Sequence, residues 1–104
     1  MINGCGFFRK ADKVRYARVN SSGTVLDSCG ISSVTVNGAG DYTVNFETAA
    51  SSANYAVLVS VHTTSIGSTA VVDNETTNSV DVFTATSGNS PANRAFSITI
   101  IEEC

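Results

Sequence analysis

The segment Ile31–Phe46, Ile-Ser-Ser-Val-Thr-Val-Asn-Gly-Ala-Gly-Asp-Tyr-Thr-Val-Asn-Phe, decides the fold of this chain. Apolar and polar residues alternate on either side of its centre, and a period of two is typical of strands that bury one face. The Asn-Gly-Ala-Gly centre contains residue types that adopt positive φ readily, which favours a tight turn. The segment therefore predicts an antiparallel hairpin with one buried face on each strand. The positions expected on these buried faces are Val34, Val36, Tyr42, Val44 and Phe46.

Similar alternating segments follow one another along the rest of the chain, separated by clusters of Ser, Gly and Asn. Short strands that recur about every 8 to 12 residues are typical of an all-β sandwich or barrel. No segment shows helical periodicity, and the stretch Thr48–Ser52 is long enough for one helical turn at most. We therefore predict an all-β fold, an antiparallel β-sandwich of about eight short strands with an N-terminal arm. The expected strands are Val14–Asn20, Thr24–Ser28, Ile31–Asn37, Asp41–Phe46, Tyr55–His62, Ser68–Val72, Ser79–Thr84 and Ala95–Ile101.

The length of 104 residues fits one domain with a single core. We expect residues 1–13 to form the arm and residues 14–104 to form one β-sandwich domain. The chain is 42% apolar and only 14% charged, which favours a protein that covers part of its surface with neighbouring subunits. It has no apolar run long enough for a membrane span and no pattern of a secretion signal at its start. We therefore expect no membrane partner and no export through the Sec pathway.

The charges are distributed unevenly, because five of the six cationic residues lie between positions 9 and 18 of a chain whose net charge is -3. Two interpretations remain open. The cations either keep a strand soluble and protect a sheet edge, or they form an anchoring arm that binds an acidic surface, such as a neighbouring copy of this chain. The low pI of 4.8 and the few aromatic residues argue against nucleic acid as a partner. The candidate partner-binding residues are Phe7, Phe8, Arg9, Lys10, Lys13, Arg15 and Arg18.

No motif for catalysis or cofactor binding stands out. The single histidine, His62, has no companion that the sequence places beside it, and there is no Gly-x-Ser-x-Gly segment. The spacing of Asp73, Glu75 and Asp81 does not match a calcium-binding EF-hand loop, so we interpret them as solvated charges. We expect that the protein is not an enzyme and that it binds no cofactor and no metal.

The three cysteines, Cys5, Cys29 and Cys104, are an odd number and include no Cys-x-x-Cys pair. This spacing indicates neither a disulfide scaffold nor a zinc site. Because we expect no export, and thiols stay reduced inside cells, we expect free cysteines. A late bridge between Cys5 and Cys104 remains an alternative.

The central hairpin and the residues before it resemble a module found in bacteriophage virion proteins, especially at the ends of tail fibres. The module reads roughly as Ala-aromatic-Val-Asn-Phe, Gly-Thr, Val-Ser-Ser-Ile-Thr, Gly-x-Gly-Asp-Tyr-Thr-Val-Asn-Phe and Ala-Asn-Tyr. Arg18 and Ser21 stand where the module usually has aromatic residues. The matching residues here are Ala17, Val19, Asn20, Gly23, Thr24, Ile31–Thr35, Gly38, Gly40–Phe46 and Ala53–Ala56.

The resemblance implies a phage virion structural protein on the particle surface, assembled in the cytoplasm of the host bacterium. It also implies an oligomer, for which we expect a homotrimer. Two functions remain open. The short chain favours a head decoration (cement) protein that binds the major capsid protein, whereas the resemblance itself favours a tail-fibre or receptor-binding tip protein that recognises host surface glycans.

Overall fold

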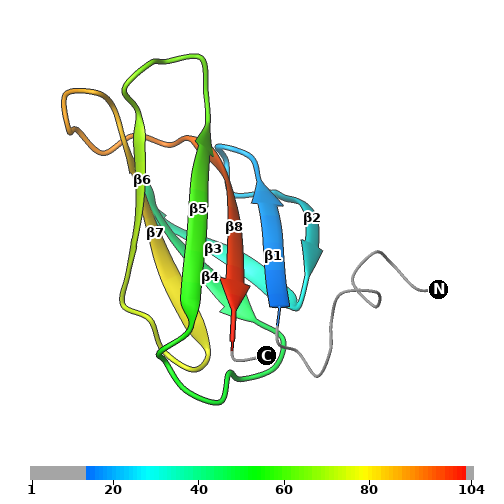
Figure 1. Ribbon diagram of the computed structural model, residues 1–104. Helices are drawn as coiled ribbons and strands as arrows, with labels where there is room; N and C mark the ends of the chain where they lie inside the picture. The colour runs from blue at the N-terminus through cyan, green and yellow to red at the C-terminus, as the bar shows by residue number, and fades with distance from the viewer. Residues whose placement is uncertain (1–13, 103–104) are drawn as a thin grey trace.

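The protein is a sandwich of two four-stranded antiparallel sheets (Figure 1). The computed structural model describes residues 14–102, and this part of the chain contains eight strands and no helix. Sheet A has the strand order β2-β1-β8-β5, and sheet B has the order β3-β4-β7-β6. The strands are β1 (Val14–Val19), β2 (Val25–Cys29), β3 (Ile31–Gly38), β4 (Asp41–Phe46), β5 (Ala56–His62), β6 (Thr69–Asp73), β7 (Ser79–Ala85) and β8 (Ala95–Ile101).

The sequence predicted each of these strands to within one residue at either end, and the predicted all-β sandwich is confirmed. The prediction succeeded because the alternation is regular where one side of a strand is buried. In β4, β7 and β8 every second residue is buried and the residues between them are partly exposed. The stretch Thr48–Ser52, which had room for a helical turn, forms none.

The core lies between the inner faces of the two sheets. The predicted inward residues Tyr42, Val44 and Phe46 are all buried, and the ring of Tyr42 packs edge-on against that of Phe96, 5.0 Å between centroids. Burying apolar surface of this kind is the main force that holds a sandwich together. The buried cluster consists of Ala17, Val19, Ile31, Tyr42, Val44, Phe46, Ala50, Val80, Val82, Phe96, Ile98 and Ile100.

One expected core position is wrong. Val36 was placed on the buried face of β3, but 42% of it is exposed. β3 is an edge strand whose pairing with β4 shifts between Val36 and Gly38. Val36 therefore has a neighbouring strand on one flank only.

The sandwich has two ends, which we call lower and upper. β1 begins and β8 ends at the lower end, where Val14 pairs with Ile101 (Figure 1). The upper end carries the loop between β5 and β6 and the loop between β7 and β8. Different residues close these two ends.

The expectation of free thiols is wrong for Cys29, which is disulfide-bonded. Cys29 is the last residue of β2 and is buried. The chain's other two cysteines, Cys5 and Cys104, lie outside the described residues. Folding brings cysteines together across any distance in sequence, so their spacing could not reveal this bond.

Candidate interaction surfaces

Two of the candidate arm residues, Arg15 and Arg18, lie within the described residues, and both belong to β1. Successive residues of a strand point to opposite faces of the sheet. Arg15 and Arg18 are three residues apart, so they point to opposite faces of sheet A. Their surroundings differ accordingly. The remaining candidates, Phe7, Phe8, Arg9, Lys10 and Lys13, lie outside the described residues.

Arg15 does not present its charge to a partner, which corrects its place in the predicted arm. Its side chain is 1% exposed and forms an ion pair with Glu102, whose side chain is 7% exposed. Its guanidinium also donates a hydrogen bond of 3.1 Å to the Thr48 carbonyl oxygen and lies 4.8 Å from the centroid of the Phe46 ring. A buried guanidinium with these contacts supports the lower end of the fold and is not available for binding.

Glu102 connects three parts of the chain at this lower end. One of its carboxylate oxygens accepts a hydrogen bond from Arg15, and the other accepts hydrogen bonds from the backbone N–H of Ser51, at 3.1 Å, and from its hydroxyl, at 3.0 Å. Burial by itself raises the pKa of Glu102, but these hydrogen bonds and the positive charge of Arg15 outweigh burial and lower the pKa below its usual value of 4.5. The carboxylate is therefore held in its charged form.

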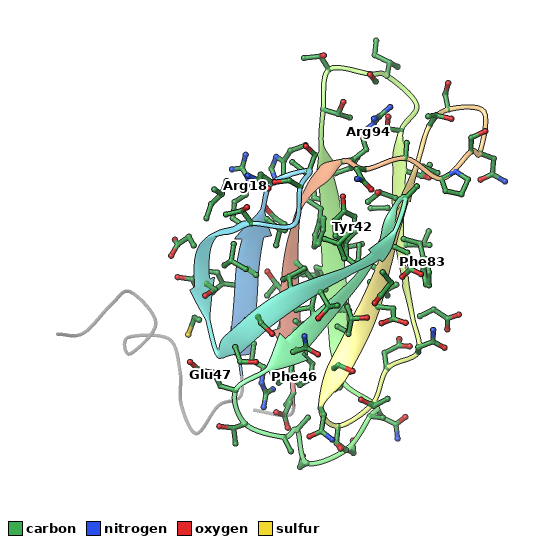
Figure 2. All side chains as sticks on the ribbon, turned by 180° about the vertical axis from the view of Figure 1, so that it is seen from behind. Arg18, Tyr42, Phe46, Glu47, Phe83 and Arg94 are labelled. Atoms are coloured by element: carbon green, nitrogen blue, oxygen red, sulfur yellow. The ribbon has the colours of Figure 1, made fainter. Side chains whose placement is uncertain are left out.

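Arg18 is exposed on the outer face of sheet A, near the upper end of β1 (Figure 2). It lies opposite Asp27 of β2 and Ser97 of β8. The same row continues to Ser60 of β5, and His62 of β5 shares a hydrogen bond of 2.6 Å with the Ser97 hydroxyl. The upper half of this outer face is therefore polar.

The lower half of the outer face of sheet A is largely apolar. Val14 and Ala56 both lie opposite Ile101, and Leu58 lies opposite Thr99 in the adjacent row. Leu58 is 65% exposed and Ile101 is 38% exposed. Four strands contribute to the sheet, and three of them supply apolar side chains to this region. We call it the apolar patch, and its residues are Val14, Tyr16, Ala56, Leu58, Thr99 and Ile101.

The outer face of sheet B is covered instead by a network of polar side chains. The Asn37 amide donates to the hydroxyl of Thr43 at 2.8 Å, and this hydroxyl donates to the Asp81 carboxylate at 2.7 Å. The Asn74 amide donates to the other oxygen of Asp81 at 2.8 Å. The Asn45 amide donates to two hydroxyls of β3, those of Ser33 at 3.1 Å and Thr35 at 3.2 Å. These hydrogen bonds connect β3, β4, β7 and the turn after β6, so this part of the face is polar and ordered.

A groove of about 400 Å³ lies at the upper end of this polar face. Asp41, Phe83 and Val71 lie side by side in β4, β7 and β6. All three side chains point to the outer side of sheet B. The loop between β7 and β8 borders the row, because Pro91 forms a bridge with Ala85. Figure 2 shows Phe83 in the upper half of β7, far from Phe46 at the lower end. The lining residues are Ala39, Gly40, Asp41, Thr69, Val71, Phe83, Thr84, Ala85, Asn89 and Pro91.

This groove was not predicted from the sequence. In β7, Asp81 and Phe83 alternate with buried residues, so both lie on the outer face. An aromatic residue on an otherwise polar strand face is an observable signal, yet the sequence does not show which strands flank it. The pairing of β7 with β4 and β6 brings together residues that are far apart in the chain.

Among residues 14–102 no group of three or more His, Cys, Asp or Glu side chains is placed to hold a metal ion, and no helix is long and apolar enough to cross a membrane. No family model, curated protein or solved structure matches this chain. The surfaces themselves therefore carry the functional argument.

Proposed function

We propose that this chain is a non-enzymatic structural protein of a bacteriophage virion, and that it serves as a head decoration (cement) protein on the outer capsid. In this function it associates with itself as a homotrimer and binds the major capsid protein. The proposal starts from the resemblance of the Ile31–Phe46 hairpin to a phage virion module. The observation that supports it most directly is the apolar patch on sheet A.

The apolar patch is the kind of surface that a cement protein needs. An exposed apolar area that spans several strands costs free energy in water and usually marks a protein–protein interface. Leu58 stands on β5, an edge strand of sheet A, so a neighbouring subunit can approach the patch without displacing any other strand. On the outer face of sheet B, by contrast, many polar side chains are hydrogen-bonded to one another within the molecule.

The first experiment measures the oligomeric state by sedimentation velocity. We expect the protein to sediment as a trimer and Leu58→Ser to weaken the assembly at least about tenfold, since burying a leucine side chain contributes about 1.5 to 3 kcal/mol. Ile66→Ser is the matched control, because Ile66 is 96% exposed and lies in the loop between β5 and β6, away from the patch. A monomer at micromolar concentration would contradict self-association through this surface.

The second experiment measures where the protein lies on the particle. Purified virions would be labelled with an antibody against the chain and counted by electron microscopy. A cement protein is expected in many copies over the capsid, whereas label confined to the tail would overturn the capsid assignment. Particles stripped of the protein should also rebind it, and Leu58→Ser should reduce this rebinding while Ile66→Ser leaves it unchanged.

A second function, recognition of host surface glycans by a tail-fibre or receptor-binding tip protein, is favoured by a separate observation. The groove beside Phe83 combines an aromatic ring with polar groups. It lies at the upper end of the sandwich, whereas β1 begins and β8 ends at the lower end. Such a groove has no obvious use in a protein that acts only as cement.

A further inference from the structure

We propose that the groove beside Phe83 binds a neutral pyranose unit of a surface polysaccharide. This sugar site rests on the second candidate function, glycan recognition. It names the residues that would perform that function. The site lies on sheet B, on the opposite side of the sandwich from the apolar patch. The two surfaces can therefore be occupied at the same time.

The floor of the groove is apolar at its centre and polar at one side. Phe83 of β7 lies directly between Asp41 of β4 and Val71 of β6, on the same face of the sheet. Phe83 is partly exposed, and 55% of Val71 is exposed. A pyranose ring has one face of C–H groups and a rim of hydroxyl groups. Phe83 and Val71 fit the C–H face, while the neighbouring carboxylate of Asp41 fits the hydroxyl rim.

The groups around the floor are hydrogen-bonding groups of the kind that sugars need. Thr69 and Asn89 line the groove together with Asp41, and Pro91 adds an apolar wall. A carboxylate accepts hydrogen bonds from hydroxyls, and an amide or a hydroxyl both donates and accepts. The volume of about 400 Å³ lies within the range of about 300 to 1,000 Å³ that is usual for ligand pockets. The groove is thus large enough for one sugar ring and open enough for a chain to continue.

The wall of the groove is held in place before any ligand arrives. The loop between β7 and β8 is fixed at its base, where the Thr84 hydroxyl donates to the Ala92 carbonyl oxygen at 2.6 Å. The Gly40 N–H donates to the Asn93 side chain at 2.7 Å, which ties the same loop to the β3–β4 turn. Farther out, Thr86 N–H donates to the Ser90 carbonyl oxygen at 2.9 Å. A preformed wall lowers the entropy that is lost on binding.

The charge of this face selects among sugars. The outer side of sheet B carries Asp41, Asp81 and Asp73. Asp81 of β7 lies directly opposite Asp73 of β6 in the sheet. No arginine or lysine lines the groove. A sugar that carries a carboxylate or a sulfate would meet repulsion here. The ligand is therefore a neutral sugar, and an acidic one such as a sialic acid is excluded.

The test is a titration followed by ¹H–¹⁵N NMR on the full chain. The probes are the methyl pyranosides of glucose, galactose, mannose and N-acetylglucosamine, with sialyllactose as the acidic comparison. We expect at least one neutral glycoside to bind with a dissociation constant of about 1 to 10 mM. The amide signals that move should belong to residues 39–41, 69–71, 83–85 and 89–91. Sialyllactose should leave these signals unchanged.

Two variants test the assignment of residues. Phe83→Ala should weaken binding at least about tenfold, because it removes the ring against which the sugar packs. Asn89→Gly removes the amide but keeps the turn, since Asn89 has a φ of 69°, which glycine adopts without strain. It should weaken binding about threefold to tenfold. Ile66→Ser is again the control, and thermal unfolding checks that each variant folds.

The outcomes of these experiments separate the sugar site from the cement function. If no neutral glycoside moves the signals of the groove residues, the sugar site is wrong, while a sedimenting trimer would leave the cement function standing. Binding that Phe83→Ala does not weaken would also overturn the site. If Phe83→Ala dissociates the oligomer and no sugar binds, the groove is filled by a second copy of the chain, which would again overturn it. Sugar binding together with a monomer would leave the site in place and remove the trimer.

Discussion

The two ends of the sandwich are closed by different chemistry. At the lower end, Arg15 and Glu102 form a buried ion pair beside the ring of Phe46, and that ring meets Tyr55 edge-on at 5.6 Å between centroids. At the upper end, the closing contacts are hydrogen bonds to hydroxyl and backbone carbonyl oxygens, some of them donated by the guanidinium of Arg94. The Tyr42 hydroxyl donates to the Ser21 carbonyl oxygen at 2.7 Å.

This difference determines how each end responds to pH and to substitution. A buried ion pair depends on both charges being present, so the lower end is sensitive to pH and to the loss of either partner. Hydrogen bonds to backbone groups depend on the exact path of the chain, so the upper end is sensitive to the shape of its turns. Substitutions at the two ends should therefore differ in pH dependence as well as in size.

The largest effect is expected from Phe46→Ala at the lower end. The substitution leaves a cavity in the core and removes the ring that packs against the guanidinium of Arg15. The free energy of unfolding should fall by about 3 to 5 kcal/mol. Urea unfolding followed by circular dichroism measures this loss. A loss below about 1 kcal/mol would mean that Phe46 does not contribute to the core as its burial indicates.

The next effect is expected from Gly40→Ala at the upper end. Gly40 has a φ of 67°, and a Cβ there would lie 2.2 Å from the Thr84 carbonyl oxygen. Both the backbone strain and the clash are unfavourable, so the variant should lose about 2 to 4 kcal/mol. Gly38→Ala is the matched control in the same turn, because a Cβ at Gly38 meets nothing within 4 Å. Equal losses in the two variants would refute the steric explanation.

A smaller effect with a distinct pH dependence is expected from Glu102→Gln. Because the pKa of Glu102 is lowered on folding, its charge stabilises the folded state above the ordinary value of 4.5, and this contribution is lost as the pH falls through the lowered pKa. The variant should lose about 1 to 2 kcal/mol at pH 7. Its stability should also fall less steeply than that of the parent between pH 5 and about pH 2.

The control for this pH series is Glu75→Gln, which removes an exposed carboxylate from the turn between β6 and β7. Exposed charges contribute little to stability. Its unfolding free energy should follow that of the parent across the series. If Glu102→Gln and the parent lose stability in parallel on acidification, the lower end does not depend on this ion pair.

The smallest effect is expected from Tyr42→Phe at the upper end. The ring keeps its contact with Phe96, and the hydrogen bond to the Ser21 carbonyl oxygen is lost. The variant should lose about 1 kcal/mol. Burial raises the pKa of Tyr42, so the hydroxyl stays neutral and the loss should be the same at pH 5 and pH 8. A loss that changes with pH in this range would break the contrast between the two ends.

The sequence was sufficient to predict the strands and most of the core. Where a strand has one face in the core, as in β4 with Tyr42, Val44 and Phe46, the alternation determines both its extent and its buried side. The prediction failed for Val36, because the pattern is the same in an edge strand although one flank has no neighbour. Alternation identifies the side of a strand, but the degree of burial depends on the other strands.

The candidate surfaces were harder to predict, since they are made by residues far apart in sequence. Arg15 resembled the other cations before it, and only its pairing with Glu102, 87 residues later, removes it from the surface. The row of Asp41, Phe83 and Val71 likewise depends on the order of strands in sheet B. Local patterns cannot specify that order, because each strand of a sheet fits next to several others.

The pairing of Val14 with Ile101 has a mechanical consequence. The first and last strands are neighbours in sheet A, and their outer ends lie together at the lower end (Figure 1). A force that pulls these ends apart acts across the β1–β8 ladder and breaks its hydrogen bonds one after another, as a zipper opens, instead of shearing them all at once. The ion pair between Arg15 and Glu102 lies at the point where such opening would begin, so it carries the first load.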